Sequence, residues 1–358
     1  NTFKQQLIVN LDYKEDHPFL HFPLLDKMLN KKVDLSCSEY KNGDIRKNSF
    51  SLFIGCDVTL PRLMLNPNGY LSTYVFTEHA DWGDIRTHRA TYFGSEDIKK
   101  ARKAKGGFVK NKIPVTKSVF YSNPDNVLNS QSTHQSISQT PVANIKSTDG
   151  FEDFLKQLNK RRYDICLHTP DQYTAERQLL KEAIEYMKEN FNSVSWIDHG
   201  YDNTSKNNRE DLVCDGLDSS SSSYTNDFWK KFETKYFWDT YYEDFAHADT
   251  GYLFNTSFIK PYIGFGDCFP TPNYCKHPNL PSSIYLWFTK DLLEMPDPSG
   301  WNYQFSEDRL NDFASNYGVT FNHCYPAGSI LNKGFWTVDQ KNKIVVQPEF
   351  DKALQRLS

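Results

Sequence analysis

The sequence lacks the features that assign many chains to a class at once. No apolar run is long enough to cross a bilayer, and no signal-peptide core stands at the N-terminus, so we expect no membrane-spanning segment. The seven cysteines are odd in number and include no CxxC pair, which excludes a zinc finger or a thioredoxin-type motif. Basic residues number 41 against 45 acidic ones and form no long run, so we expect no nucleic-acid partner.

Short catalytic motifs are missing as well. The chain has no GxSxG nucleophile elbow, no GxxxxGKS/T phosphate loop, no HExxH and no GxGxxG. Aromatic residues, in contrast, are abundant, with 7 Trp, 21 Tyr and 26 Phe. Their rings have flat apolar faces, and those of Trp and Tyr also carry a polar edge. This composition fits either a Tyr-rich core and surface or a cleft that stacks sugar rings.

The order of predicted elements indicates an α/β protein. Strands and helices alternate from residue 70 to about 200, which predicts βαβ units and a parallel sheet. A chain of 358 residues suits one large α/β barrel with insertions. We expect residues 1–69 to form a β-rich extension packed on the barrel and residues 70–358 to form the barrel itself. A Gly-, Pro- and aromatic-rich stretch at about 248–305 is predicted to be an insertion that walls a cleft.

Local patterns predict individual elements. A helix is expected from Ser95, its cap, to the glycines at 106–107, and a polar segment at 122–149 is expected to be a mobile insertion. Apolar residues at helical spacing predict two further helices, one after Asp149 and one from Thr174 to Phe191.

An apolar strand at residues 71–77 stops abruptly in ionisable side chains. The residues concerned are Glu78, His79, Asp81, Asp84 and His88. In parallel α/β architectures, functional residues collect at the carboxyl ends of strands. The cluster therefore predicts a site, although any one of these residues alone also fits a solvated loop.

Three later strands also end in such residues, namely His168, the pair Asp198 and His199, and His323. If these strands are parallel neighbours, their ends converge at one face of the sheet. Imidazole and carboxylate groups are suitable ligands for Zn²⁺ or a related divalent ion, and a catalytic site keeps one position open for water. The metal would lower the pKa of that water, and a spare acid and base would handle the protons.

The order of these motifs resembles that of the polysaccharide deacetylases, the NodB-like carbohydrate esterases. VFTEHAD resembles their first motif, IPVTKSVFY their second strand, ICLHTPDQY their second motif and GVTFNHCYPAG their C-terminal motif. The resemblance implies a distorted (β/α)₇ barrel, a divalent metal (usually zinc) and the removal of N-acetyl groups from sugars.

The resemblance also implies roles for particular residues. Asp81 and His168 match metal ligands of the family, and His79, His88 and His199 are candidates for a third ligand because Gln172 stands where the family has its second histidine. Ala80 stands where the family has its base, so Glu78 or Asp84 would substitute. The remaining catalytic candidates are Asp198, which alternatively orients His199, and His323, as the acid that protonates the departing nitrogen.

Two other functions remain open from the sequence. A glycoside hydrolase without a metal would use two carboxylates, drawn from Glu78, Asp81, Asp198 and Asp239. A sugar-binding or surface-polysaccharide assembly protein with a decayed site fits the replacements at Ala80 and Gln172. The expected partner is a glycan in each case, and bacterial export to the periplasm or cell surface is favoured over the cytoplasm. Cys268 and Cys275 would close a small loop in an exported protein.

Overall fold

The computed structural model describes most of the chain from residue 69 onward. The described ranges are 69–132, 138–172, 176–197, 224–238, 300–302, 305–315, 319–330 and 335–358, with residue 220 and the short strands at 2–4, 8–9, 20–21, 39–41, 274–276 and 285–287. Before residue 69, β1 (Thr2–Lys4) pairs with β4 (Glu39–Lys41), and β2 (Ile8–Val9) pairs with β3 (Leu20–His21), both antiparallel. The rest of the predicted N-terminal extension, and most of the predicted insertion at 248–305, lie outside the described residues.

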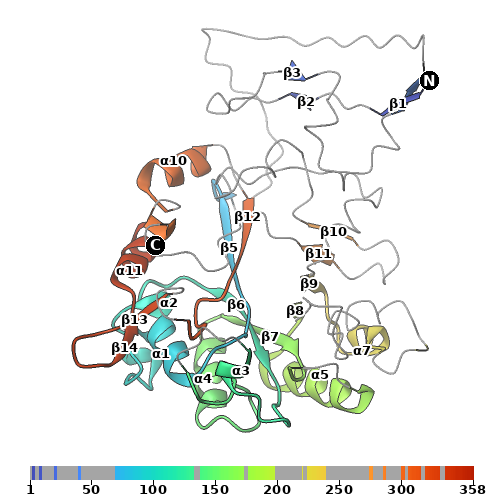
Figure 1. Ribbon diagram of the computed structural model, residues 1–358. Coiled ribbons are helices and arrows are strands. Elements are labelled where there is room, and N and C mark those ends of the chain that lie inside the picture. Colours follow the sequence, from blue (N-terminus) through green and yellow to red (C-terminus); the bar gives the residue numbers. More distant parts are fainter. Residues whose placement is uncertain are drawn as a thin grey trace.

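One mixed sheet forms the centre of the protein, and its spatial order is β10-β11-β9-β8-β7-β6-β5-β12. All neighbouring pairs are parallel except β10 with β11, and the sheet is curled like part of an α/β barrel (Figure 1). The strands are β5 (Thr73–Glu78), β6 (Val115–Phe120), β7 (Asp164–Thr169), β8 (Ser195–Ile197), β9 (Tyr236–Trp238), β10 (Tyr274–Lys276), β11 (Tyr285–Trp287) and β12 (Val319–Cys324). The predicted α/β class and parallel sheet are thus confirmed.

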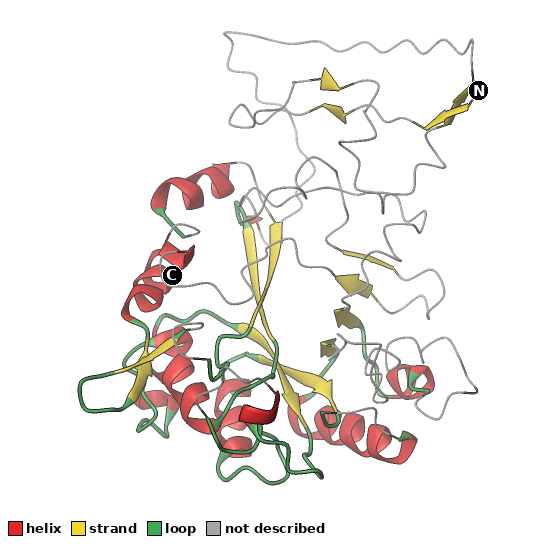
Figure 2. Cartoon of the chain, in the orientation of Figure 1, coloured by secondary structure: helices red, strands yellow, loops and turns green. Residues whose placement is uncertain are grey.

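Helices connect the strands and lie beside and below the sheet in the view of Figure 2. They are α1 (Ile85–Phe93), α2 (Gly107–Lys110), α3 (Asn129–Ser132), α4 (Phe151–Asn159), α5 (Arg177–Phe191), α7 (Asn226–Lys231), α10 (Glu307–Ser315) and α11 (Pro348–Leu357), with a 3₁₀ turn η4 (Ala101–Lys103). A hairpin of β13 (Trp336–Val338) and β14 (Ile344–Val346) contacts α1. None of the described helices is long and apolar enough to cross a bilayer.

Two helices follow the predicted pattern closely. The buried residues of α4 are Phe151, Phe154, Leu155 and Leu158, and those of α5 are Leu180, Ala183, Ile184, Met187 and Phe191. Both sets repeat at intervals of three and four residues, which places them on one face of a helix. The periodic pattern therefore identified both helices and the side by which they pack.

The helix predicted from Ser95 to residue 105 is wrong. Only the 3₁₀ turn forms there, and the helix that follows β5 is α1, which begins ten residues earlier. The backbone of this segment pairs instead with the distant β14 hairpin, through a bridge between Ser95 and Val345 and a hydrogen bond from Glu96 N to Ile344 O. A partner so far along the chain leaves no local sequence pattern.

The segment predicted to be a mobile insertion, 122–149, is largely packed in its described parts. Val142, Ala143 and Asn144 are at most 2 % exposed, and Ala143 N donates to Gly83 O. The segment thus covers the loop that follows β5.

Aromatic side chains make up much of the core. Trp301 contacts Phe76, Phe335 and Phe350, and Phe108 joins the same cluster. All five rings are at most 2 % exposed. Part of the aromatic richness of the sequence therefore serves packing.

Candidate metal centre

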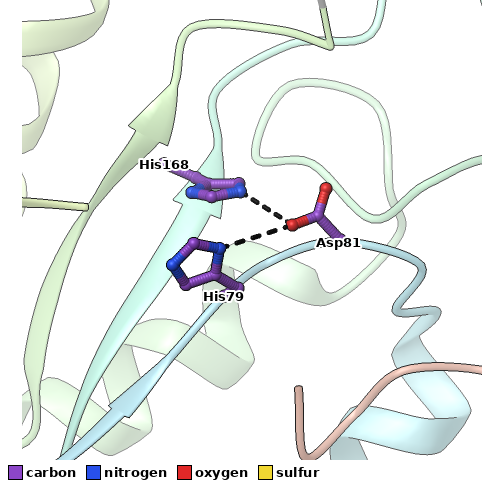
Figure 3. A group of neighbouring side chains, drawn as sticks. All are labelled: His79, Asp81 and His168. Carbon is purple, nitrogen blue, oxygen red and sulfur yellow. Dashed lines mark hydrogen bonds and ion pairs between the residues drawn. The ribbon is translucent and has the colours of Figure 1, made fainter. Parts of the chain in front are cut away.

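Three ionisable side chains from two strand ends meet at one point (Figure 3). His79 and Asp81 lie in the loop after β5, and His168 lies near the end of β7. One potential ligand atom from each residue lies within 4.8 Å of the others, and all three residues are buried. His168 Nε2 is 2.9 Å from Asp81 Oδ2, and His79 Nδ1 is 3.6 Å from the same oxygen.

The sheet explains why residues so distant in sequence meet. β5 and β7 flank β6, and parallel strands bring their carboxyl ends to the same edge. His79 N donates to Cys324 O, which extends the pairing of β5 with β12 by one residue. Ala80 then packs against Phe120 and Val142, and the chain turns at this small buried residue to present Asp81 to His168.

The hydrogen bonds of His168 decide where its lone pair lies. Its Nδ1 is 2.8 Å from Ile197 O, and a backbone carbonyl only accepts, so Nδ1 carries the proton. In the neutral ring, Nε2 then has a lone pair, and this lone pair faces the Asp81 carboxylate at 2.9 Å. Two electron-rich atoms at this distance require a positive charge between them. A proton shared in a hydrogen bond, or a cation bound by both residues, meets this requirement.

The donor set fits a divalent cation. Two imidazole nitrogens and one carboxylate oxygen form a common ligand set of catalytic zinc, which leaves one position for water. Metal–ligand distances of roughly 2.0–2.2 Å in a tetrahedron place the ligand atoms roughly 3.3–3.6 Å apart. The 3.6 Å between His79 Nδ1 and Asp81 Oδ2 lies within that range, whereas the 2.9 Å between His168 Nε2 and Asp81 Oδ2 is the length of a direct hydrogen bond, which a bound cation would lengthen. The carbonyl of Ile197 supplies the second contact that fixes a ligating histidine.

Glu78 and His88 do not join this group but form a buried ionic network with Lys117 and Tyr92. Lys117 Nζ is 2.7 Å from Glu78 Oε1 and 3.3 Å from His88 Nδ1. The hydroxyl of Tyr92 donates a hydrogen bond to Glu78 Oε2. Successive residues of a strand point to opposite faces, so Glu78 reaches α1 and β6 whereas His79 reaches His168. The side chains of Glu78 and Lys117 are fully buried.

The electrostatics of this network follow from its burial. Burial raises the pKa of Glu78 and lowers that of Lys117, and the ion pair between them opposes both shifts. Burial, and then the charge of Lys117, hold the pKa of His88 well below its usual value. His88 is therefore neutral and accepts a hydrogen bond from Lys117 at Nδ1.

Asp84 is the N-cap of α1. Its Oδ1 accepts from the backbone N–H groups of Arg86 and Thr87, and its Oδ2 accepts from Arg86 and Ser138. Burial alone would raise the pKa of this carboxyl, but the hydrogen bonds from Arg86 and Ser138 outweigh burial and lower it. Oδ1 thus caps α1, and Oδ2 is held by the side chains of Arg86 and Ser138.

Trp82, which sequence reasoning passed over, has an unusual backbone. Its φ of 57° lies in the left-handed region, where a residue with a side chain costs about 1–2 kcal/mol. Its carbonyl accepts from Ser329 N, and the next residue, Gly83, forms a β-bridge with Gly328. A Cβ on Gly83 would lie 2.6 Å from His88 Nε2, so a larger residue there would have to displace the His88 ring. The sequence Asp81-Trp82-Gly83, a large aromatic residue between an acid and a glycine, is the feature that could have indicated this turn.

The other predicted site residues are less fully described. Asp198 and His199, like Asp239, lie outside the described residues. His323 lies on β12 in register with Thr77 of β5, but its side chain belongs to the undescribed part. Gln172 is 3 % exposed and Ala80 is 3 % exposed.

Comparison with known proteins adds no family assignment. The chain matches no protein-family model, no curated protein and no solved structure.

Proposed function

We propose that this protein is a metal-dependent hydrolase that removes the acetyl group from an N-acetylated sugar or a related amide. The proposal includes a zinc ion, or a related divalent cation, held by His79, Asp81 and His168. It also includes the distorted (β/α)₇ barrel of the NodB-like type for the whole chain. The partly closed parallel sheet supports this architecture because β5 to β8 follow one another in the expected order.

One observation carries the proposal. His168 Nε2 lies 2.9 Å from a carboxylate oxygen of Asp81, in a place from which water is nearly excluded, while His168 Nδ1 is engaged by Ile197 O. A cation at this point satisfies both atoms and explains why two imidazoles and an acid are buried together. When bound, such a cation supplies Lewis acidity for water activation and for polarising an amide carbonyl.

Different residues of the chain would position the ligands and transfer the protons. Ile197 O fixes the tautomer of His168, and the turn at Ala80 fixes Asp81. We assign the proton transfers to Asp198 and His323, because Glu78 is paired with Lys117 and Asp84 caps α1. His199 remains a proposed additional ligand.

Metal analysis tests the proposal. The purified protein, dialysed against buffer with a trace of zinc, is expected to retain about one equivalent, and His168→Ala is expected to lose it. His88→Gln is the matched control, because it removes a buried histidine of the same region that lies outside the group. Full metal content in His168→Ala, or none in the wild type, would exclude the proposed centre. Deacetylation that survives complete metal removal would do the same.

A second function is favoured by one observation. The buried group contains a single carboxylate, Asp81, and the position of the family's base is Ala80, enclosed by Phe120 and Val142. A glycan-binding protein that holds a cation without hydrolysis fits this arrangement. Zinc retention and sugar binding without release of acetate would identify that function.

A further inference from the structure

We propose that Trp82 and Tyr325 form an aromatic wall that binds the sugar ring of the substrate, beside the His79–Asp81–His168 group. This inference rests on the proposed function and names the surface that recognises the sugar rather than the acetyl group. Trp82 lies in the loop after β5, and Tyr325 directly follows β12. These strands are parallel neighbours, so both residues lie at the edge of the sheet where ligands bind in α/β proteins.

The two rings lie next to one of the candidate metal ligands and to each other. The ring of Tyr325 meets the ring of His79 edge-on at 5.1 Å, and the ring of Trp82 stacks on Tyr325 at 5.0 Å with 24° between the planes. Trp82 also directly follows Asp81 in the chain. A substrate with its amide at the cation therefore has its ring within reach of both side chains.

Trp82 is only partly covered, unlike the buried tryptophans of the described core. Trp196, Trp229, Trp301 and Trp336 are each at most 1 % exposed, whereas Trp82 and Tyr325 remain partly exposed. Trp82 also keeps the left-handed backbone described above, which the contacts with Ser329 and Gly328 enforce. A large aromatic side chain that stays partly exposed directly after a candidate ligand, on a backbone held in the left-handed region, is placed to contact a ligand.

The chemistry of the wall matches a sugar ring. A pyranose has a face of C–H groups, which is apolar, and a rim of hydroxyls, which stay hydrated. Trp and Tyr offer flat apolar faces with polar edges, and ligand sites combine such aromatic surfaces with a few polar groups. Because an N-acetylated sugar carries such a ring directly beside its amide nitrogen, it can contact the wall and the cation at once.

Binding to the metal-free protein tests the wall separately from hydrolysis. The full chain is labelled with 5-fluorotryptophan, stripped of metal with a chelator and titrated with the methyl glycoside of N-acetylglucosamine. The resonance of Trp82, identified by its absence in Trp82→Phe, is expected to shift, whereas N-methylacetamide, which has no ring, is expected to leave it unchanged.

Variants give the decisive comparison, with affinities measured by calorimetry. Trp82→Gly keeps a residue that tolerates the left-handed backbone, so it is expected to fold and to bind the glycoside about tenfold more weakly. Trp82→Phe retains an aromatic face and is expected to stay within about threefold of the wild type. Tyr70→Ala removes an aromatic residue that is 64 % exposed and is expected to change nothing.

The outcomes separate this inference from the proposed function. Wild-type affinity in Trp82→Gly, or a response to indole or tetramethylammonium but not to the glycoside, overturns the wall. Zinc retention without glycoside binding also contradicts the aromatic wall but remains compatible with the proposed metal centre. Glycoside binding that depends on Trp82 in a protein that never retains zinc supports the wall and rejects the metal-dependent hydrolase.

Discussion

The buried pair of Lys117 and Glu78 allows the sharpest prediction about stability. Lys117→Met keeps the length of the side chain but removes the charge that faces Glu78 at 2.7 Å. Both side chains are fully buried, so the carboxylate left behind has neither water nor a cation to compensate it. Breaking one partner of a buried pair in this way lowers the free energy of unfolding by about 3–5 kcal/mol.

A second change is expected to restore much of that loss. Glu78→Gln in the Lys117→Met background removes the stranded charge, and the amide oxygen still accepts the hydroxyl of Tyr92. We expect the double variant to recover at least about 2 kcal/mol, since most of the penalty belongs to the uncompensated charge rather than to the lost attraction. The two singles and the double form a cycle that measures the coupling.

Urea unfolding followed by tryptophan fluorescence and by circular dichroism is the assay, provided that the two transitions coincide. Lys343→Met is the control: this lysine is 46 % exposed and pairs with Asp97 at the surface, where such pairs contribute about 0–1 kcal/mol. If Lys117→Met costs no more than Lys343→Met, or if Glu78→Gln fails to rescue it, the network described here does not exist as a buried ion pair.

Three further predictions concern the same region. Acidification from pH 6.5 to 5 is expected to lower the free energy of unfolding by up to about 1.4 kcal/mol per pH unit through His88, because the unfolded chain takes up a proton that the folded His88, with its lowered pKa, does not. Unfolding curves of chelated protein over this pH range should show a shallower dependence of stability on pH for His88→Gln, and an equal dependence would show that His88 is not the group responsible. Gly83→Ala is expected to cost about 1–3 kcal/mol because the new Cβ meets His88 Nε2 at 2.6 Å, and the double change with His88→Ala should be less than additive in urea unfolding. Zinc at a hundredfold excess over its dissociation constant is expected to stabilise the wild type by about 2.7 kcal/mol in the same assay but not Asp81→Asn, and equal stabilisation of both would place the cation elsewhere.

Periodic patterns in the sequence predicted the elements whose packing is local. The apolar spacing in α4 and α5 identified their buried faces, and the apolar runs that end near Asp81 and His168 indicated parallel strands whose ends converge. The meeting of Asp81 with His168 at 2.9 Å follows from that topology.

The rest depended on contacts that the local sequence does not encode. Asp84 looked like a catalytic candidate, and the helix that it caps, α1, was overlooked because its segment is rich in Thr, Arg and His rather than in aliphatic residues. The Lys- and Arg-rich stretch after Ser95 resembled a helix end, yet it forms only the 3₁₀ turn η4, and the backbone of Ser95 and Glu96 before it pairs with β14. For Glu78, the alternation of side chains along the strand could be predicted from the sequence. Its buried ion pair with Lys117 of the neighbouring strand could not.

The pairing of β5 with β12 has a consequence for how the centre assembles. Cys324 Sγ donates to Thr77 O across 247 residues of chain, and the loop that carries His79 and Asp81 is bonded to residues 324–329 on its other side. During synthesis, this loop emerges long before the strand that braces it. The centre is therefore among the last parts to mature, and a polypeptide that stops short of Val319 retains all three candidate ligands but lacks the brace that orders two of them.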